Sequence, residues 1–232
     1  MRVKGRDRSV AAMDTAPPAR IAPSLFAFAI FYGGMVCIAG VLGNKQVALG
    51  PLAVEAGIFA FLLLVVTSSA VAELHGAHWA NRLVRIGFVP LVVSLLLSLL
   101  VWALPASAEM VADRPEALAA IQGILFSTWR IWIGGIVAYG ISQTLNVTIF
   151  SWLKGGEGTH LLWLRSAVAG VLSQVVDTFV FIAIAFYGEF PIGGLLAGQL
   201  LAKVTLSAVL VPPLIYLMVA LGRKLDGAPA PR

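Results

Sequence analysis

Residues 161–186 read LLWLRSAVAGVLSQVVDTFVFIAIAF, an apolar run long enough to cross a lipid bilayer. Two ionisable residues, Arg165 and Asp177, lie within it. An Asp or Arg at the centre of a membrane helix costs about 2.5 to 3.5 kcal/mol on insertion scales, so such residues usually face a bundle interior or a water-filled cavity. The period of an α-helix places Ser173, Gln174 and Asp177 on one face. We therefore expect something polar to face this stripe.

The composition of the 232-residue chain is that of an integral membrane protein. Hydrophobic residues make up 59% of it and charged residues 12%, and the mean hydropathy is +0.94, whereas soluble domains carry about 25% charged residues. At about 20 residues for each crossing, the length accommodates about six spans. Long apolar runs exclude an outer-membrane barrel, whose strands alternate apolar and polar residues. The predicted fold class is all-α, a polytopic six-transmembrane-helix bundle.

Apolar runs and polar connections predict one six-helix transmembrane domain, residues 21–222, between two tails. Residues 1–20 are predicted to be a disordered cytoplasmic tail, and residues 223–232 a second cytoplasmic tail. The predicted spans follow the apolar runs, at residues 21–42, 57–74, 86–104, 130–150, 161–186 and 193–220. Residues 75–85 and 105–116 are predicted connections, and 117–128 an interfacial or tilted lead-in to the fourth span. Pro212 and Pro213 should kink the sixth span.

Basic residues predict how the spans are oriented. They occur in both tails, in the connection between spans two and three, and in the connection between spans four and five. The opposite connections carry the acidic residues Glu55, Glu109, Asp113, Glu116 and Glu189. By the positive-inside rule, both termini face the cytoplasm. The net charge of +5 comes from residues that flank spans, so it gives no reason to expect nucleic acid as a partner.

Ionisable residues in or at the ends of the predicted spans are the first candidates for a site: Glu73, Arg130, Arg165, Asp177 and Lys203. Glu73, Arg130 and Arg165 fall near span ends, where an interfacial anchor is the alternative to a binding role. Asp177 and Lys203 lie deeper. They either form an ion pair that holds spans five and six together, or bind a substrate. We favour the second, because an apolar contact would hold the helices without the desolvation cost.

Uncharged polar residues recur at helical spacing on spans four and five. Gln143 and Asn146 give span four a polar face, and Ser173 and Gln174 give one to span five. Interhelical hydrogen bonds of this kind are common and are worth about 0.6 kcal/mol each. Two such faces that meet a lysine from span six predict a pocket for a neutral, multiply hydrogen-bonding, planar solute. The aromatic residues available to stack on it are Tyr139, Trp163 and a phenylalanine.

Catalytic and metal-binding motifs are absent from the sequence. It contains no H-E-x-x-H, G-x-S-x-G or G-x-x-x-x-G-K-[ST] motif. His75, His78 and His160 lie in predicted connections without the spacing of metal ligands. Cys37 is the single cysteine, so no intrachain disulfide can form. We therefore predict no enzymatic activity, no cofactor and no metal.

Two long segments, RIWIGGIVAYGISQTLNVTIFSWLK (130–154) and LWLRSAVAGVLSQVVDTFVFIAIAF (162–186), precede a final span with Lys203. Together with the shorter ELHG (73–76) and GNKQ (43–46), they make the chain resemble the queuosine precursor transporter family, also described as vitamin-uptake-like transporters. The resemblance implies a bacterial inner-membrane importer that serves tRNA modification. Its substrate would be 7-cyano-7-deazaguanine or 7-aminomethyl-7-deazaguanine.

The resemblance also implies a binding set. Family motif positions are occupied by Arg130, Gln143, Arg165, Ser173, Gln174, Asp177 and Lys203. With Glu73 and Asn146 they form the predicted substrate-binding set, in a pocket between spans two, four, five and six. One carboxylate, Asp177 or Glu73, can accept both adjacent N–H donors of a guanine-like edge. Gly40, Ser69 and Asn146 replace polar or acidic residues of the family pattern, which leaves the exact precursor open.

Two alternatives to a solitary importer remain open at this point. One is the substrate-binding subunit of an energy-coupling-factor vitamin transporter, which needs separate ATPase and coupling subunits. The other is a non-transporting membrane scaffold whose buried charges only specify helix pairing. The predicted partners are a purine-like small molecule and the lipid bilayer, without nucleic acid. Homo-oligomerisation and proton coupling are left open by the sequence.

Overall fold

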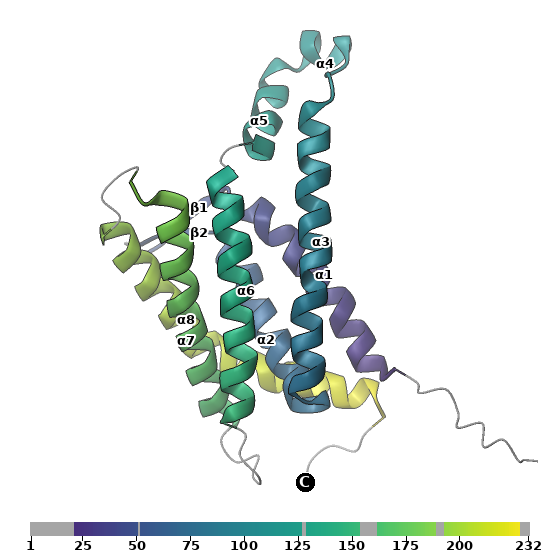
Figure 1. Cartoon of the computed structure of the whole chain (residues 1–232), viewed down its shortest axis with the longest axis vertical. Coiled ribbons are helices and arrows are strands. Elements are labelled where there is room, and N and C mark those ends of the chain that lie inside the picture. The colour runs from purple at the N-terminus through teal and green to yellow at the C-terminus, as the bar shows by residue number, and fades with distance from the viewer. Residues whose placement is uncertain (1–20, 51, 127–128, 154–161, 189–192, 228–232) are drawn as a thin grey trace, which may run out of the picture.

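The computed structural model describes residues 21–50, 52–126, 129–153, 162–188 and 193–227. Six of its helices are long and apolar enough to cross a membrane (Figure 1). They are α1 (Pro23–Leu42), α2 (Gly57–His75), α3 (Ala77–Ala103), α6 (Trp129–Trp152), α7 (Leu162–Phe186) and α8 (Gly193–Leu225). The predicted six-helix bundle is thus confirmed. The predicted tail at residues 1–20 lies outside the described residues.

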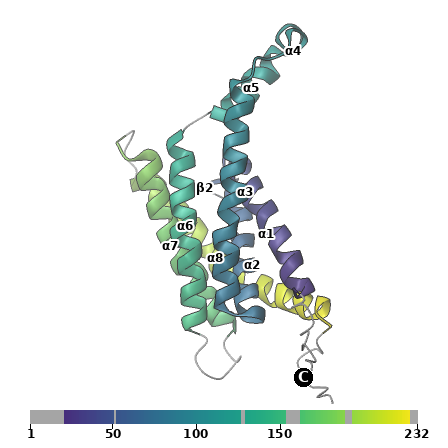
Figure 2. The ribbon, with the colours of Figure 1, turned by 45° about the vertical axis from the view of Figure 1, so that its right-hand side comes forward.

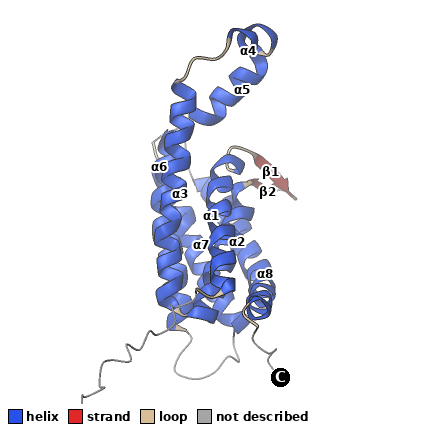
Figure 3. Ribbon diagram, turned by 90° about the vertical axis from the view of Figure 1, so that its right-hand side faces the viewer, coloured by secondary structure: helices blue, strands red, loops and turns tan. Residues whose placement is uncertain are grey.

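The connections contain structure that the sequence analysis did not predict. Between α1 and α2, the strands β1 (Gln46–Leu49) and β2 (Leu52–Glu55) form an antiparallel hairpin. Between α3 and α6 lie α4 (Ala108–Asp113), which was not predicted, and α5 (Pro115–Phe126), which covers most of the lead-in predicted at residues 117–128. The predicted loop at 105–116 therefore includes a short helix, whose first turn is capped by a hydrogen bond from Met110 N to Ser107 Oγ. The hairpin, α4 and α5 lie toward the same end of the bundle (Figure 3).

The connection between α2 and α3 is much shorter than the predicted one at 75–85. Gly76 alone separates the two helices, with a φ of +86°. This backbone conformation favours glycine, so the chain can reverse direction within one residue. As a result α3 begins at Ala77 rather than at residue 86, and Arg82 and Arg85 lie in its first turns instead of in a loop.

The bundle is built around α2. Most residues of α2 are buried, and it contacts α1, α3, α6, α7 and α8. By contrast, the buried residues of α3 end at Gly87, and the rest of that helix presents an apolar surface. The α6–α7 contact is close because Gly134 has no side chain: a Cβ there would lie 3.3 Å from the carbonyl oxygen of Phe181. These contacts bring the polar faces of α6 and α7 against α2 and α8.

The sixth span, α8, continues as one helix through Pro212 and Pro213. Its direction changes in the second half (Figures 1 and 2), in line with the predicted kink. This second half crosses the ends of α1 and α2, where Gly222 lies against Leu74 and Phe28. The helix ends at Leu225, whereas the sixth span was predicted to end at residue 220.

A hydrogen-bonded cluster of Ser24, His75 and Asp226 joins the start of α1 to the ends of α2 and α8. The backbone N and the Oγ of Ser24 donate hydrogen bonds to the two carboxylate oxygens of Asp226, over 2.9 and 2.7 Å. His75 Nε2 lies 2.7 Å from Ser24 Oγ. Because the hydroxyl proton of Ser24 goes to Asp226, His75 must be the donor in this second bond. The start of α1 and the end of α8 therefore lie together, at the end of the bundle opposite the hairpin.

Candidate ligand-binding site

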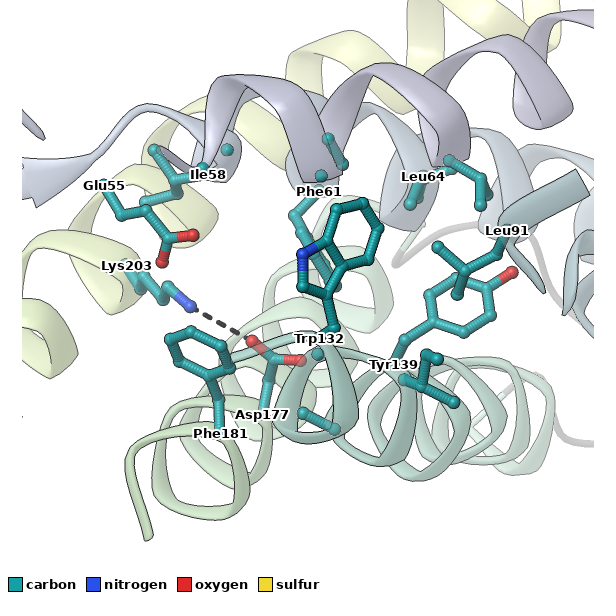
Figure 4. Close-up of a pocket in the computed structure, with 18 of the residues that line it drawn as sticks. Glu55, Ile58, Phe61, Leu64, Leu91, Trp132, Tyr139, Asp177, Phe181 and Lys203 are labelled. Carbon is teal, nitrogen blue, oxygen red and sulfur yellow. Dashed lines mark hydrogen bonds and ion pairs between the residues drawn. The ribbon is translucent and has the colours of Figure 1, made fainter. Parts of the chain in front are cut away.

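A cavity of about 330 Å³ lies in the half of the bundle nearer to the hairpin. All six spans and β2 contribute to its wall. Its polar and charged lining residues are Asn44, Glu55, Tyr139, Asp177, Gln199 and Lys203. The charged side chains are grouped at one end, whereas Leu64, Leu91 and Tyr139 lie at the other (Figure 4). A volume of this order and a mostly apolar lining with few polar groups are typical of small-molecule sites.

Asp177 on α7 and Lys203 on α8 form an ion pair at the wall of this cavity. Lys203 Nζ lies 3.1 Å from Asp177 Oδ2, and the two side chains are 5% and 2% exposed. Ser142 Oγ, from α6, donates to the other oxygen, Asp177 Oδ1, over 3.0 Å. These residues therefore pair across the α7–α8 contact and also line a cavity, whereas the binding of a substrate stays a prediction.

The Asp177–Lys203 pair keeps hydrogen-bonding capacity toward the cavity. An ionised carboxylate offers about four lone-pair sites, and an ammonium three donors. Asp177 accepts from Ser142 and Lys203, while Lys203 donates to Asp177. The ammonium also lies 5.9 Å from the ring centroids of Phe61 and Phe181, near the limit for a cation–π contact. The pair can therefore accept from a neutral ligand and donate to it at the same time.

Glu55 is the third charged residue of the cavity, and the sequence analysis placed it only in a connection. As the last residue of β2, it is folded back so that its carboxylate lies beside Lys203 (Figure 4). A Cβ added at Gly43 would come 2.5 Å from Glu55 Oε1, so glycine leaves the space that the carboxylate fills. Burial raises the pKa of Glu55, while Lys203 lowers it and Asp177 raises it. The sequence signal was one acidic residue in the otherwise apolar run LAVEAGIF.

The aromatic wall differs from the predicted one. Tyr139 lines the cavity, although its hydroxyl already donates to Tyr32 Oη over 3.0 Å. Trp163 is 52% exposed and lies outside the cavity, so its expected stacking role is not supported. Trp132, which the sequence analysis did not single out, projects into the middle of the cavity (Figure 4). A Cβ at Gly40 would lie 3.4 Å from the Trp132 ring, so Gly40 leaves room for the indole.

The predicted residues of α6 bond to protein groups rather than line the cavity. Asn146 Nδ2 donates to Ser68 Oγ and to Ser69 Oγ, each over 3.1 Å. Gln143 Oε1 accepts from Tyr32 over 3.4 Å and from Ser68 over 3.5 Å. Gln143 Nε2 and Asn146 Oδ1 have no hydrogen-bond partner in the described part of the chain. Ser69 and Asn146, two of the departures from the family pattern, are thus in direct contact.

The remaining uncharged residues of the predicted set lie on α7. Ser173 Oγ donates to the carbonyl oxygen of Gly170 within the same helix, over 2.9 Å. Gln174 is buried, and its Oε1 has no hydrogen-bond partner among the described residues. Neither residue lines the cavity. Arg130 belongs to the first turn of α6, but its side chain lies outside the described part of the structure.

A second buried ion pair joins Glu73, in the last turn of α2, to Arg165, in the first turn of α7. Arg165 Nη2 lies 2.8 Å from Glu73 Oε2, and both side chains are at most 5% exposed. The guanidinium lies 4.4 Å from the ring centroid of Phe150. This pair does not line the cavity and lies toward the opposite end of the bundle. Of the predicted residues whose side chains the structure describes, Asp177 and Lys203 are the two brought together at the cavity wall.

The histidines and the cysteine do not form a metal centre in the described residues. No group of three or more His, Cys, Asp or Glu side chains there could hold a metal ion. His75 is bound to Ser24, and Cys37 Sγ accepts a hydrogen bond from Ser94 Oγ over 3.2 Å.

Similarity to known proteins points to transporters. A family model described as a putative vitamin uptake transporter matches residues 55–218. A probable queuosine precursor transporter of Bacillus subtilis (strain 168) is 30% identical over 149 residues, which are 63% of this chain and 62% of that protein. The match therefore spans less than two thirds of that relative. No solved structure matches the chain.

Proposed function

Because the chain belongs to the putative vitamin uptake transporter family, we propose that it is a solitary importer of a 7-deazaguanine precursor of queuosine in the bacterial inner membrane. The name of the Bacillus subtilis relative supports this substrate. Six apolar helices support a multi-pass membrane protein. The observation that carries the proposal is the cavity with the buried Asp177–Lys203 pair in its wall. Family membership supports transport rather than catalysis as the role of this cavity.

The chemistry of the cavity suits a planar base. Asp177 can accept the adjacent N–H donors of a guanine-like edge, while Lys203 and Gln199 can donate to its carbonyl oxygen. Trp132 and Phe181 offer flat apolar faces, and the stacking of a base on an aromatic side chain is worth about 1–3 kcal/mol. The family description refers to vitamins in general. The combination of donors, acceptors and stacking rings favours a base among such solutes.

The proposed transport path runs along the interior faces of α2, α6, α7 and α8, with α1, β2 and α3 also contributing to the binding site. The cavity lies nearer the hairpin, and the Glu73–Arg165 pair lies nearer the termini. With both termini in the cytoplasm, as the basic residues predict, the cavity faces the side from which an importer loads its substrate. The Glu73–Arg165 pair then closes the cytoplasmic end, and substrate release requires that this contact open.

Uptake of labelled precursor by a host that cannot make it tests the proposal. We expect the wild-type chain to restore uptake, and Asp177→Asn or Lys203→Ala to abolish it while the protein stays folded in detergent. Asp113→Asn, which changes an exposed carboxylate of α4, is the matched control and should leave uptake unchanged. Unchanged uptake in both cavity variants would refute the site assignment. A wild-type chain that restores no uptake would refute the transport function.

A further inference from the structure

The cavity wall holds two carboxyl groups and one amino group. Its charged lining residues are Glu55, Asp177 and Lys203. Asp177 and Lys203 neutralise each other at 3.1 Å, whereas Glu55 forms no ion pair with any described residue. A carboxylate that forms no ion pair is costly in a mostly apolar cavity. Burial raises the pKa of Glu55 and Asp177 raises it further, while the nearby Lys203 lowers it. A glutamine would fill the same space without that cost. A carboxylate at this position is therefore better explained by a role in binding than by packing.

The backbone around Glu55 holds its carboxylate in place. Ala56 N donates to the carbonyl oxygen of Lys45 over 2.7 Å, which ties down the chain directly after Glu55. The end of α1 and the start of α2 approach closely, because Gly43 and Gly57 meet there: a Cβ at Gly57 would lie 3.3 Å from Gly43 Cα. Gly43 also leaves the space for the Glu55 carboxylate. Glu55 is therefore a positioned group of the cavity wall rather than a residue of a loose loop.

We propose that Glu55 is the counter-charge for a positively charged substituent on the ligand, so that the cavity prefers a purine-like base with an ammonium group to its neutral counterpart. This inference rests on the proposed function, since it states which precursor the same site prefers. The 7-aminomethyl compound carries such a group, and the 7-cyano compound does not. With the first, the charges in the cavity sum to zero. With the second, one negative charge stays buried beneath a ligand that cannot neutralise it.

The order of the groups along the wall matches the order of groups on such a ligand. On a 7-deazaguanine the N–H donors, the carbonyl oxygen and the substituent at C7 follow one another around one side of the base. Asp177, Lys203 and Glu55 follow one another at the charged end of the cavity, with the ammonium between the two carboxylates (Figure 4). A base stacked on Trp132 can therefore present its donors to Asp177, its carbonyl to Lys203 and its substituent to Glu55.

Competition binding to the purified full-length chain in detergent tests this inference, with the 7-aminomethyl and 7-cyano compounds as probes. We expect the wild type to bind the aminomethyl compound at least about tenfold more tightly. Glu55→Gln keeps the shape of the side chain and removes its charge. It should bring the ratio of the two dissociation constants close to one by weakening the aminomethyl compound alone. Glu116→Gln, at an exposed carboxylate of α5, should leave the ratio unchanged.

Other results of the same experiment would overturn the inference, and they distinguish its failure from a failure of the proposed function. Equal binding of the two compounds by the wild type, or the same ratio in Glu55→Gln, overturns it and leaves the proposed function standing. Equal weakening of both compounds in Glu55→Gln also overturns it, since Glu55 would then bind the base that they share. Binding of neither compound by the wild type refutes the proposed function itself. If Glu55→Gln does not fold, Glu55→Asp should lower the ratio part of the way, and an unchanged ratio there would overturn the inference.

Discussion

Two buried ion pairs connect helices in the described part of the chain, and one of them borders the cavity. Asp177 and Lys203 join α7 to α8 in the cavity wall, whereas Glu73 and Arg165 join α2 to α7 away from it, with Phe150 beneath the guanidinium. All four side chains are at most 5% exposed, so the two pairs incur similar desolvation costs. The difference lies in the space beside the charges. A pair next to a cavity can bind a ligand, and an enclosed pair can only hold or release a helix contact.

The largest effect, on the free energy of unfolding, is expected from breaking the Glu73–Arg165 pair. Arg165→Ala removes the guanidinium that lies 2.8 Å from the buried Glu73 carboxylate, which should lower the free energy of unfolding by about 3–5 kcal/mol. Thermal unfolding in detergent measures the change. The double variant Arg165→Leu with Glu73→Gln should recover part of the stability, because no charge is then left unpaired. A single variant as stable as the wild type would show that this pair does not hold α2 and α7 together.

Removing the stacking ring of the cavity should have the next largest effect. Trp132→Ala should weaken ligand binding by about 1–3 kcal/mol, the usual value for one base on one aromatic side chain. Titration calorimetry with the aminomethyl compound measures it. Trp163→Ala removes an indole that is 52% exposed and outside the cavity, so its affinity should equal that of the wild type. Equal losses in both variants would contradict the assignment of the cavity as the binding site.

A smaller effect on ligand affinity is expected from a substitution at Gly43, which leaves room for the Glu55 carboxylate. In Gly43→Ala the new Cβ would come within 2.5 Å of Glu55 Oε1, so the carboxylate must move. Because the displaced atom ends a flexible side chain, we expect the protein to fold and the affinity for the aminomethyl compound to fall about threefold to tenfold, at most about 1.4 kcal/mol. Gly198→Ala on α8 meets no atom within 4 Å and serves as the control. An unaltered affinity in Gly43→Ala would argue against a positioned Glu55.

The smallest effect on stability concerns Ser24, His75 and Asp226, the cluster that joins the ends of α1, α2 and α8. Burial of Asp226 raises its pKa, but the two hydrogen bonds from Ser24 and the nearby His75 outweigh this and lower the pKa below its ordinary value of 3.8. A depressed folded-state pKa contributes stability above the ordinary value, and this is lost as the pH falls through the folded-state pKa. Asp226→Asn should therefore lower the melting temperature modestly at pH 7. The difference from the wild type should shrink below pH 3.8, and a difference that is constant with pH would contradict this origin.

Hydropathy was sufficient to predict the six spans, because a membrane helix needs a long apolar run that nothing else in a chain of this size explains. The hairpin was not predictable in this way. Its strands have four residues each, too few for a periodic signal. The turn at Gly76, in another connection, depends on a positive φ that the neighbouring residues do not indicate. The sequence therefore determined which segments cross the membrane, but not how the connections fold back onto them.

The candidate site was predictable only in part, for a related reason. Asp177 and Lys203 stood out because an ionised group inside an apolar run is costly. Glu55 did not, since its burial results from the fold of the hairpin rather than from its neighbours in sequence. Helical periodicity correctly grouped Gln143 and Asn146 on one polar face. It could not show that this face meets Ser68 and Tyr32 instead of the cavity, because that depends on which helix packs beside it.

Thermal stabilisation by 7-aminomethyl-7-deazaguanine, compared in the wild type, Asp177→Asn and Glu73→Gln, shows whether the ligand binds at the Asp177–Lys203 pair. A ligand at 100 times its dissociation constant stabilises a protein by about 2.7 kcal/mol. We expect Glu73→Gln to unfold at a lower temperature than the wild type but to gain the same increment from the ligand, and Asp177→Asn to gain none. Full stabilisation of Asp177→Asn, or its loss in Glu73→Gln alone, would contradict the claim that the ligand binds at the Asp177–Lys203 pair.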